Sequence, residues 1–211
     1  LPTFKKYSWF SKIKVELMEE AYNKLGYFLL LLIPLTFLGF YKTYFIQFPS
    51  FEKSITIFIH LHAIIASIWI LLLIVQPLLI INRKYKLHRK IGKLSYIFFP
   101  ILILSFVPQM IRIKNSDVPQ FLFFPLADSV LLILFYSLAI YYRKNASHHM
   151  RYFIGTATVF LGPTIGRIGP HIFAWSENTT QNVQYGIIYL ILIGLIFYDK
   201  RNKKNYRPYL L

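Results

Sequence analysis

The sequence contains no cysteine and only eight acidic residues. The absence of cysteine excludes disulfides, thiolate metal ligands, iron–sulfur clusters and a cysteine nucleophile from this chain. Any redox or metal chemistry must therefore use histidine, methionine, carboxylates or a bound cofactor. The sequence also lacks a phosphate loop, a nucleophile elbow and an HExxH zinc motif, so no motif indicates an enzyme.

Charged residues are scarce at 15%, whereas apolar residues make up 56% of the chain. A soluble domain of this length would need more polar residues to cover its surface. Apolar runs of about 20 residues, enough to cross the hydrocarbon core of a bilayer, recur along the sequence. We therefore predict an all-α, polytopic bundle of about six transmembrane helices. The expected spans lie near residues 25–44, 55–81, 94–111, 121–142, 152–173 and 183–198.

Basic residues are distributed unevenly between the loops. Of the 24 Lys and Arg residues, five lie in residues 1–24, six in 83–93, three in 143–151 and five in 200–207. All these segments fall on one side of the expected bundle. Because Lys- and Arg-rich loops stay inside the cell, the bias predicts that both termini are cytoplasmic. The net charge of +16 then indicates contact with anionic lipids and not with nucleic acid.

The expected organisation has three parts. In residues 1–24, Phe10, Ile13 and Leu17 recur at steps of three and four among lysines. This pattern predicts an amphipathic helix lying in the membrane interface, although an ordinary solvated helix fits it equally. Residues 25–198 form the transmembrane bundle, and residues 199–211 form a basic cytoplasmic tail.

Polar side chains within the apolar spans predict a site in the outer half of the membrane, because such side chains are costly when they face lipid. On the second span, three of them are spaced by seven residues, nearly two helical turns, and form one stripe. The others come from the fourth and fifth spans. The predicted cofactor-binding residues are His62, Trp69, Gln76, Asp128, Arg167 and His171.

Several interpretations of this outer site remain open. His62 and His171 could hold a b-type haem as paired imidazoles. His60, His62 and His171 could form a zinc or copper site, although histidines two residues apart on a helix diverge. Alternatively, His62 and Arg167 only hydrogen-bond to helix ends and hold the bundle together. The same residues could line a path for protons or a small solute, but no inverted repeat is visible.

A second cluster is predicted at the cytoplasmic surface, where it would bind anionic lipid headgroups or the acidic face of a partner subunit. A second haem between His88 and His149 is disfavoured, because the 22 residues from His149 to His171 span about 33 Å, the whole hydrocarbon thickness. In addition, His88 lies in the basic run KLHRK of an expected loop, and a basic run is a poor position for a buried haem ligand. The cluster consists of His88, Arg89, His149 and Arg151.

Five short motifs accompany Trp69. They are H-L-H-A from His60, V-Q-P-L-L-I at 75–80, L-H-R-K-I-G-K-L-S-Y at 87–96, H-M-R at 149–151 and G-P-x-x-G-R at 162–167. Together they resemble a family of bacterial polytopic membrane proteins of uncharacterised function. The resemblance covers roughly residues 55–171. It implies a bacterial cytoplasmic membrane and a shared polar site on the second and fifth spans, and it supplies no reaction.

Two functions of different kinds follow from these features. The first is a non-catalytic accessory or assembly subunit of a larger membrane complex, which would use its apolar, aromatic flanks for contact. The second is an electron-transfer protein that binds haem b or a metal at His62 and His171. A third and weaker hypothesis is the transport of a small solute or of protons.

Overall fold

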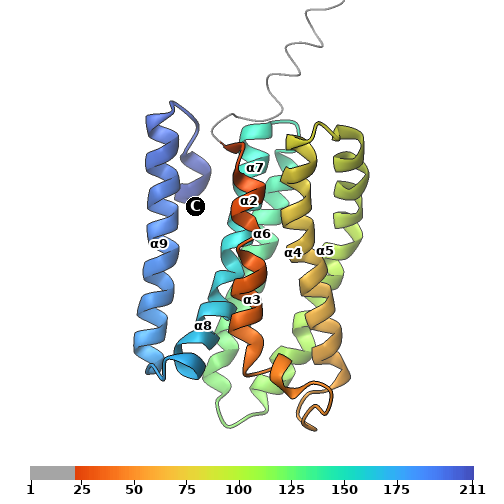
Figure 1. Cartoon of the computed structure of the whole chain (residues 1–211), viewed down its shortest axis with the longest axis vertical. Helices are drawn as coiled ribbons and strands as arrows, with labels where there is room; N and C mark the ends of the chain where they lie inside the picture. The colour runs from red at the N-terminus through yellow and green to blue at the C-terminus, as the bar shows by residue number, and fades with distance from the viewer. Residues whose placement is uncertain (1–21) are drawn as a thin grey trace, which may run out of the picture.

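The computed structural model describes residues 22–211, so the expected amphipathic helix at residues 1–24 lies almost entirely outside the described residues. The described part is helical throughout and contains no strand. Its helices run side by side along the long axis of the molecule (Figure 1). They are α2 (Leu25–Leu29), α3 (Leu32–Tyr41), α4 (Ile57–Ile81), α5 (Tyr85–Lys114), α6 (Phe123–Tyr141), α7 (Ala146–Val159), α8 (Leu161–Ile172) and α9 (Glu177–Arg201).

Four described stretches are long and apolar enough to cross a membrane: Ile57–Ile81, Tyr85–Lys114, Pro119–Tyr141 and Glu177–Arg201. Many large apolar side chains on these helices point outward and are exposed. Water would oppose such a surface, whereas lipid accommodates it. The fold therefore has the features of a helical membrane protein, as the composition predicted.

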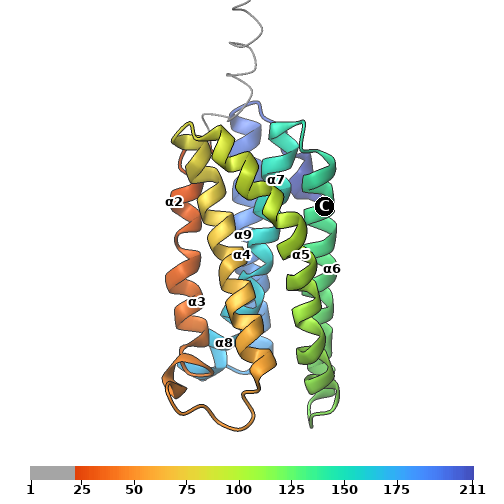
Figure 2. The ribbon, with the colours of Figure 1, turned by 90° about the vertical axis from the view of Figure 1, so that its right-hand side faces the viewer.

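Two further stretches of the bundle consist of short helices placed end to end. α2 is followed in line by α3, and α7 by α8 (Figures 1 and 2). In each case the second helix carries a proline at its third residue, Pro34 in α3 and Pro163 in α8. Proline lacks a backbone N–H donor and fits best in the first turn of a helix, where that donor has no partner within the helix, and each break lies just before one.

Three helices begin earlier than the apolar runs predicted. α5 begins at Tyr85, nine residues before the expected span, so most of the expected basic loop is helical. α7 begins at Ala146 after an Asn145 side-chain cap, and α9 at Glu177 after a Ser176 cap. An apolar run marks only the part of a helix inside hydrocarbon, whereas the helix itself continues to its cap.

The two ends of the bundle differ in charge. The connections 82–84 and 142–145 lie at one end, as do the tail after α9 and the start of α2 (Figure 1). We call this the basic end, because it contains the Lys- and Arg-rich segments 83–93, 143–144 and 200–207. The opposite end is formed by the connections 42–56, 115–122 and 173–176.

The core is built around Trp69 of α4, which is only 2% exposed. Its ring lies 5.3 Å from Phe99 of α5 and 5.6 Å from Tyr136 of α6, measured between centroids. Phe99 and Tyr136 stack on each other at 3.9 Å, and Tyr136 Oη lies 2.9 Å from Ser95 Oγ. This aromatic group joins α4, α5 and α6 near the middle of the bundle.

Helix α3 packs closely against α8 at Gly39. A Cβ on Gly39 would lie 2.7 Å from Thr164 Cγ2 and 2.8 Å from the Thr164 carbonyl oxygen. Because one of these atoms belongs to the backbone, a side chain here would push the two helices apart. Glycine permits this approach, as small residues generally do between membrane helices.

The variant Gly39→Ala is therefore expected to lower the stability of the bundle by about 1–3 kcal/mol, the usual cost of overpacking. The measurement is the thermal unfolding midpoint of the detergent-purified protein. Gly194→Ala is the matched control, because a Cβ at Gly194 meets nothing within 4 Å. Equal midpoints for the two variants would contradict the close contact.

Candidate functional site

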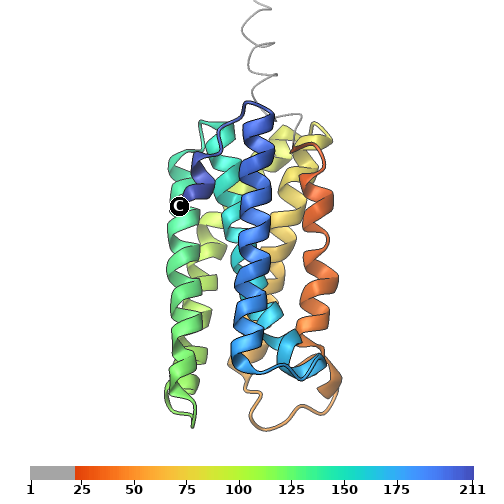
Figure 3. The same cartoon turned by 90° about the vertical axis from the view of Figure 1, so that its left-hand side faces the viewer.

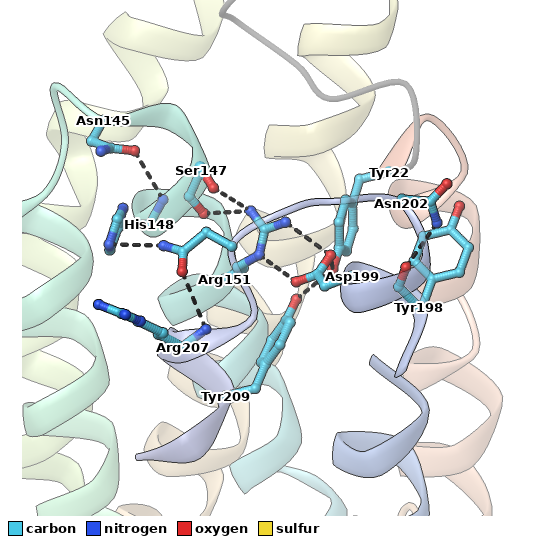
Figure 4. A network of polar contacts seen from close by, with 11 residues as sticks. Tyr22, Asn145, Ser147, His148, Arg151, Tyr198, Asp199, Asn202, Arg207 and Tyr209 are labelled. Atoms are coloured by element: carbon cyan, nitrogen blue, oxygen red, sulfur yellow. Dashed lines mark hydrogen bonds and ion pairs between the residues drawn. The ribbon is translucent and has the colours of Figure 1, made fainter. Parts of the chain in front are cut away.

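An ion pair between Arg151 of α7 and Asp199 of α9 lies at the basic end, and both side chains are fully buried. Arg151 Nε donates to Asp199 Oδ2 at 2.7 Å, and Nη2 donates to Oδ1 at 2.9 Å, which makes the pair bidentate. Arg151 Nη1 donates to the Ser147 carbonyl oxygen and hydroxyl (Figure 4). Arg151 therefore faces inward. The prediction that it belongs to a surface cluster facing lipid headgroups is wrong for this residue.

Residues near both ends of the described chain join the network around this carboxylate. Tyr22 Oη donates to Asp199 Oδ1 at 2.7 Å and lies 3.0 Å from Tyr209 Oη. The Arg151 guanidinium carbon lies 5.0 Å from the centroid of the Tyr22 ring. Burial raises the pKa of Tyr22 above its ordinary value, so its hydroxyl remains protonated and keeps donating.

Three of the predicted outer-site residues gather toward the opposite end of the bundle. Arg167 of α8 interacts electrostatically with Asp128 of α6 and with His62 of α4. Asp128 and Arg167 do not form a direct ion pair, since Arg151–Asp199 is the only ion pair between residues 22 and 211. The Arg167 guanidinium instead lies 4.4 Å from the Phe40 ring centroid and donates to the Pro163 carbonyl oxygen at 2.8 Å.

Helix α9 adds Gln184, a buried residue that the sequence analysis did not identify. A Cβ on Gly162 would lie 3.4 Å from Gln184 Nε2 and 3.7 Å from Asp128 Oδ1, and one on Gly166 would lie 3.2 Å from Gln184 Oε1. These two glycines of α8 thus make room for a buried amide. We call His62, Asp128, Arg167 and Gln184 the distal cluster.

The expected three-histidine metal site is not assembled. His62 Nδ1 lies 2.8 Å from Ser105 Oγ, and His60 Nδ1 lies 2.6 Å from Tyr44 Oη, because side chains two residues apart diverge on a helix. His171 is exposed in the last turn of α8. Throughout the described residues, no group of three or more His, Cys, Asp or Glu side chains could hold a metal ion. The same geometry leaves the proposed haem pair His62–His171 without support.

A cavity of about 630 Å³ opens at the basic end, between α2, α4, α5, α6 and α7. This volume is within the roughly 300–1,000 Å³ typical of small-molecule sites. Much of the wall is apolar, with Leu25, Leu29, Leu72, Leu73, Ile140, Phe153 and Ile154 contributing side chains. Four cationic residues also line it: Arg89, Lys93, Arg143 and Lys144.

Two histidines, His88 and His149, line this cavity and interact with each other electrostatically. His149 Nδ1 donates to the Ala139 carbonyl oxygen at 2.7 Å. His88 Nδ1 lies 3.3 Å from the Gln76 backbone oxygen. The protein thus engages Nδ1 of both rings, while neither Nε2 has a hydrogen-bond partner within residues 22–211.

The position of His88 differs from the expectation. Hydropathy and charge predicted a loop here, and the basic run around His88 made it a poor candidate for a buried haem ligand. It lies instead in the first turn of α5, which begins at Tyr85, and is half-buried against α4. The helix fixes the direction of His88, and Arg89 of the same basic run and Lys93 one turn later line the cavity with it.

The residues of the predicted stripe, His62, Trp69 and Gln76, lie in two separate regions of the bundle. His62 belongs to the distal cluster, whereas Trp69 and Gln76 line the cavity. Trp69 Nε1 is enclosed and has no hydrogen-bond partner in the described part of the chain. A buried donor without an acceptor is costly, and a ligand in the adjoining cavity is one source of an acceptor.

Comparison with known proteins adds no assignment: no protein-family model, no curated protein and no solved structure matches this chain. Function must therefore be inferred from the residues themselves. The resemblance of the motifs to bacterial polytopic membrane proteins stays a prediction. Of the features described above, the cavity offers the clearest binding chemistry, and the Arg151–Asp199 pair the clearest structural role.

Removing one partner of the buried ion pair is expected to leave an uncompensated charge and to cost about 3–5 kcal/mol. Asp199→Asn should therefore lower the thermal unfolding midpoint of the purified protein strongly. Asp117→Asn, in an exposed loop, is the control and should have no effect. The double variant Arg151→Met/Asp199→Leu should recover much of the loss. A mild effect of Asp199→Asn would show that the pair does not hold the basic end together.

Proposed function

We propose that this chain is a bacterial inner-membrane protein with about six passes and cytoplasmic ends, which binds an anionic amphiphile at its basic end. The path of the chain supports the number of passes, because the end-to-end pairs α2–α3 and α7–α8 run alongside the four long apolar helices (Figure 2). The collection of the basic connections at one end supports the orientation.

The observation that carries the proposed binding function is the combination of apolar wall and basic lining in one cavity. The wall suits the hydrocarbon or ring system of a ligand, whose burial is favourable. Arg89 and Lys93 of α5, with Arg143 and Lys144 after α6, supply positive charge from two different segments. Lys and Arg side chains at a membrane surface can bury their stems and keep the charge near water, where an anionic group would meet it.

The accessory-subunit role remains a second candidate, and helix α9 favours it. Few residues in its apolar stretch are buried. The side chains of Tyr189, Leu190 and Phe197 are each more than 60% exposed. Figure 3 shows α9 in front of the bundle, with the tail turned back beside it. A partner helix could cover this surface, but lipid satisfies it equally well, so the cavity carries the main proposal.

A transport role has less support, because the core separates the polar regions. On α4, Trp69 lies between His62 of the distal cluster and Gln76 of the cavity. On α6, Leu132 and Tyr136, which are 1% and 8% exposed, lie between Asp128 and the cavity residue Ile140. The packed core thus lies where a continuous polar path would have to run.

The orientation can be tested directly, because the chain contains no cysteine of its own. In intact cells, a membrane-impermeant maleimide should label Asp117→Cys and should leave Arg83→Cys unlabelled until the membrane is opened. The reverse pattern would place the basic end outside. Labelling of both variants in intact cells would contradict the proposed number of passes.

Ligand binding can be followed through Trp69, the one tryptophan that remains in the variant Trp9→Phe/Trp175→Phe. A brominated fatty acid is expected to quench its fluorescence saturably, because it enters the cavity beside Trp69. Brominated phosphatidylcholine at the same mole fraction is the neutral control and should quench little. Equal quenching by the two probes would show that no anion-selective cavity exists.

The charge of the cavity lining is tested in the same assay. Arg143→Gln/Lys144→Gln should weaken fatty-acid binding by about two- to ten-fold, as expected for partly exposed charge pairs. Lys114→Gln, which lies at the opposite end of α5, is the matched control and should bind as the parent does. Unchanged affinity in the double variant would exclude these two cations from recognition of the anion.

A further inference from the structure

We infer that the cavity ligand is an iron porphyrin, with His88 and His149 as its two axial ligands. This inference rests on the proposed ligand-binding function and specifies it. The two histidines come from different helices, α5 and α7, and line one cavity within electrostatic reach of each other. They are therefore placed to bind the same ligand.

The hydrogen bonds of the two rings favour metal ligation. A histidine that binds a metal through one nitrogen usually engages a carbonyl or carboxylate through the other, which fixes the ring orientation. His149 meets this condition through the Ala139 carbonyl oxygen, and His88 through the backbone carbonyl oxygen of Gln76. Since a carbonyl can only accept, His149 carries its proton on Nδ1, and its Nε2 lone pair is available.

The number of protein ligands favours a porphyrin over a bare metal ion. A structural zinc site needs about four protein ligands and a catalytic one about three. Within the described residues, no such group of His, Cys, Asp or Glu is present. A porphyrin supplies the equatorial nitrogens itself, so two axial imidazoles complete the coordination of its iron.

The walls of the cavity suit the remaining parts of such a molecule. A porphyrin has a flat apolar body and carboxylate groups at its edge. The aromatic rings of Trp69 and Phe153 and the side chain of Leu72 offer apolar contact for the body. Arg89 and Arg143 lie on separate segments of the lining and offer guanidinium groups that pair well with carboxylates. The distal cluster offers no comparable pair, because its members His62, Asp128, Arg167 and Gln184 include only one histidine.

The test is titration of the purified full-length chain with haem b in detergent, followed by reduction with dithionite. Saturable binding of one haem per chain, with the sharp α-band of a low-spin bis-imidazole complex, is the expected result. His88→Ala and His149→Ala should each abolish the sharp band. His62→Ala and His171→Ala are matched controls, because neither histidine lines the cavity, and they should leave the spectrum unchanged.

A glycine variant separates ligation from folding. In His149→Gly, added imidazole should enter the space left by the side chain and restore the sharp band, which a merely structural role of His149 would not allow. Absence of stoichiometric haem binding would overturn the inference. Haem binding with unaltered spectra in both cavity variants would also overturn it, because the iron would then be held elsewhere.

The same samples distinguish this inference from the function on which it rests. If haem does not bind but the brominated fatty acid still quenches Trp69 saturably, the cavity binds an anionic amphiphile that is not a porphyrin. If neither probe binds, both proposals fail. If haem binds and competes with the fatty acid for the cavity, both are supported.

Discussion

A buried charge in a membrane protein must be paired, because neither lipid nor a packed core can solvate it. The Arg151–Asp199 pair meets this requirement at the basic end, and much of the surrounding structure depends on it. It joins α7 to α9, and through Tyr22 and Tyr209 it fastens the segment before α2 and the tail after α9. Tyr22 also lines the cavity, so the residue that satisfies the carboxylate forms part of the binding wall.

Helix α7 links this structural pair to the candidate ligand site. Arg151 and His149 are two residues apart and therefore point about 200° apart around the helix. Arg151 reaches α9, while His149 reaches the end of α6 and the cavity. One turn of one helix thus holds the bundle together on one side and presents a ligand on the other. A change that moves Arg151 would consequently also move His149, because both lie on the same turn of α7.

The class of the protein followed from the sequence, but the composition of its sites did not. Apolar runs marked the long helices, and the seven-residue spacing correctly placed His62, Trp69 and Gln76 on one face of α4. That face is about 20 Å long, so its ends reach two different regions. His88 was assigned to a loop because hydropathy falls at the membrane surface although the helix continues. Asp199 was counted with the basic tail because Lys200 and Arg201 follow it, and its pairing with Arg151 is not visible in local sequence.

The position of Asp199 along the chain has a consequence for biosynthesis. Arg151 is synthesised before Asp199, so α7 is made while its guanidinium still lacks the carboxylate that neutralises it in the finished protein. Until α9 has been made, only Ser147 of its own helix and the surroundings can hold that charge. Closure of the basic end is therefore a late event in the folding of the chain.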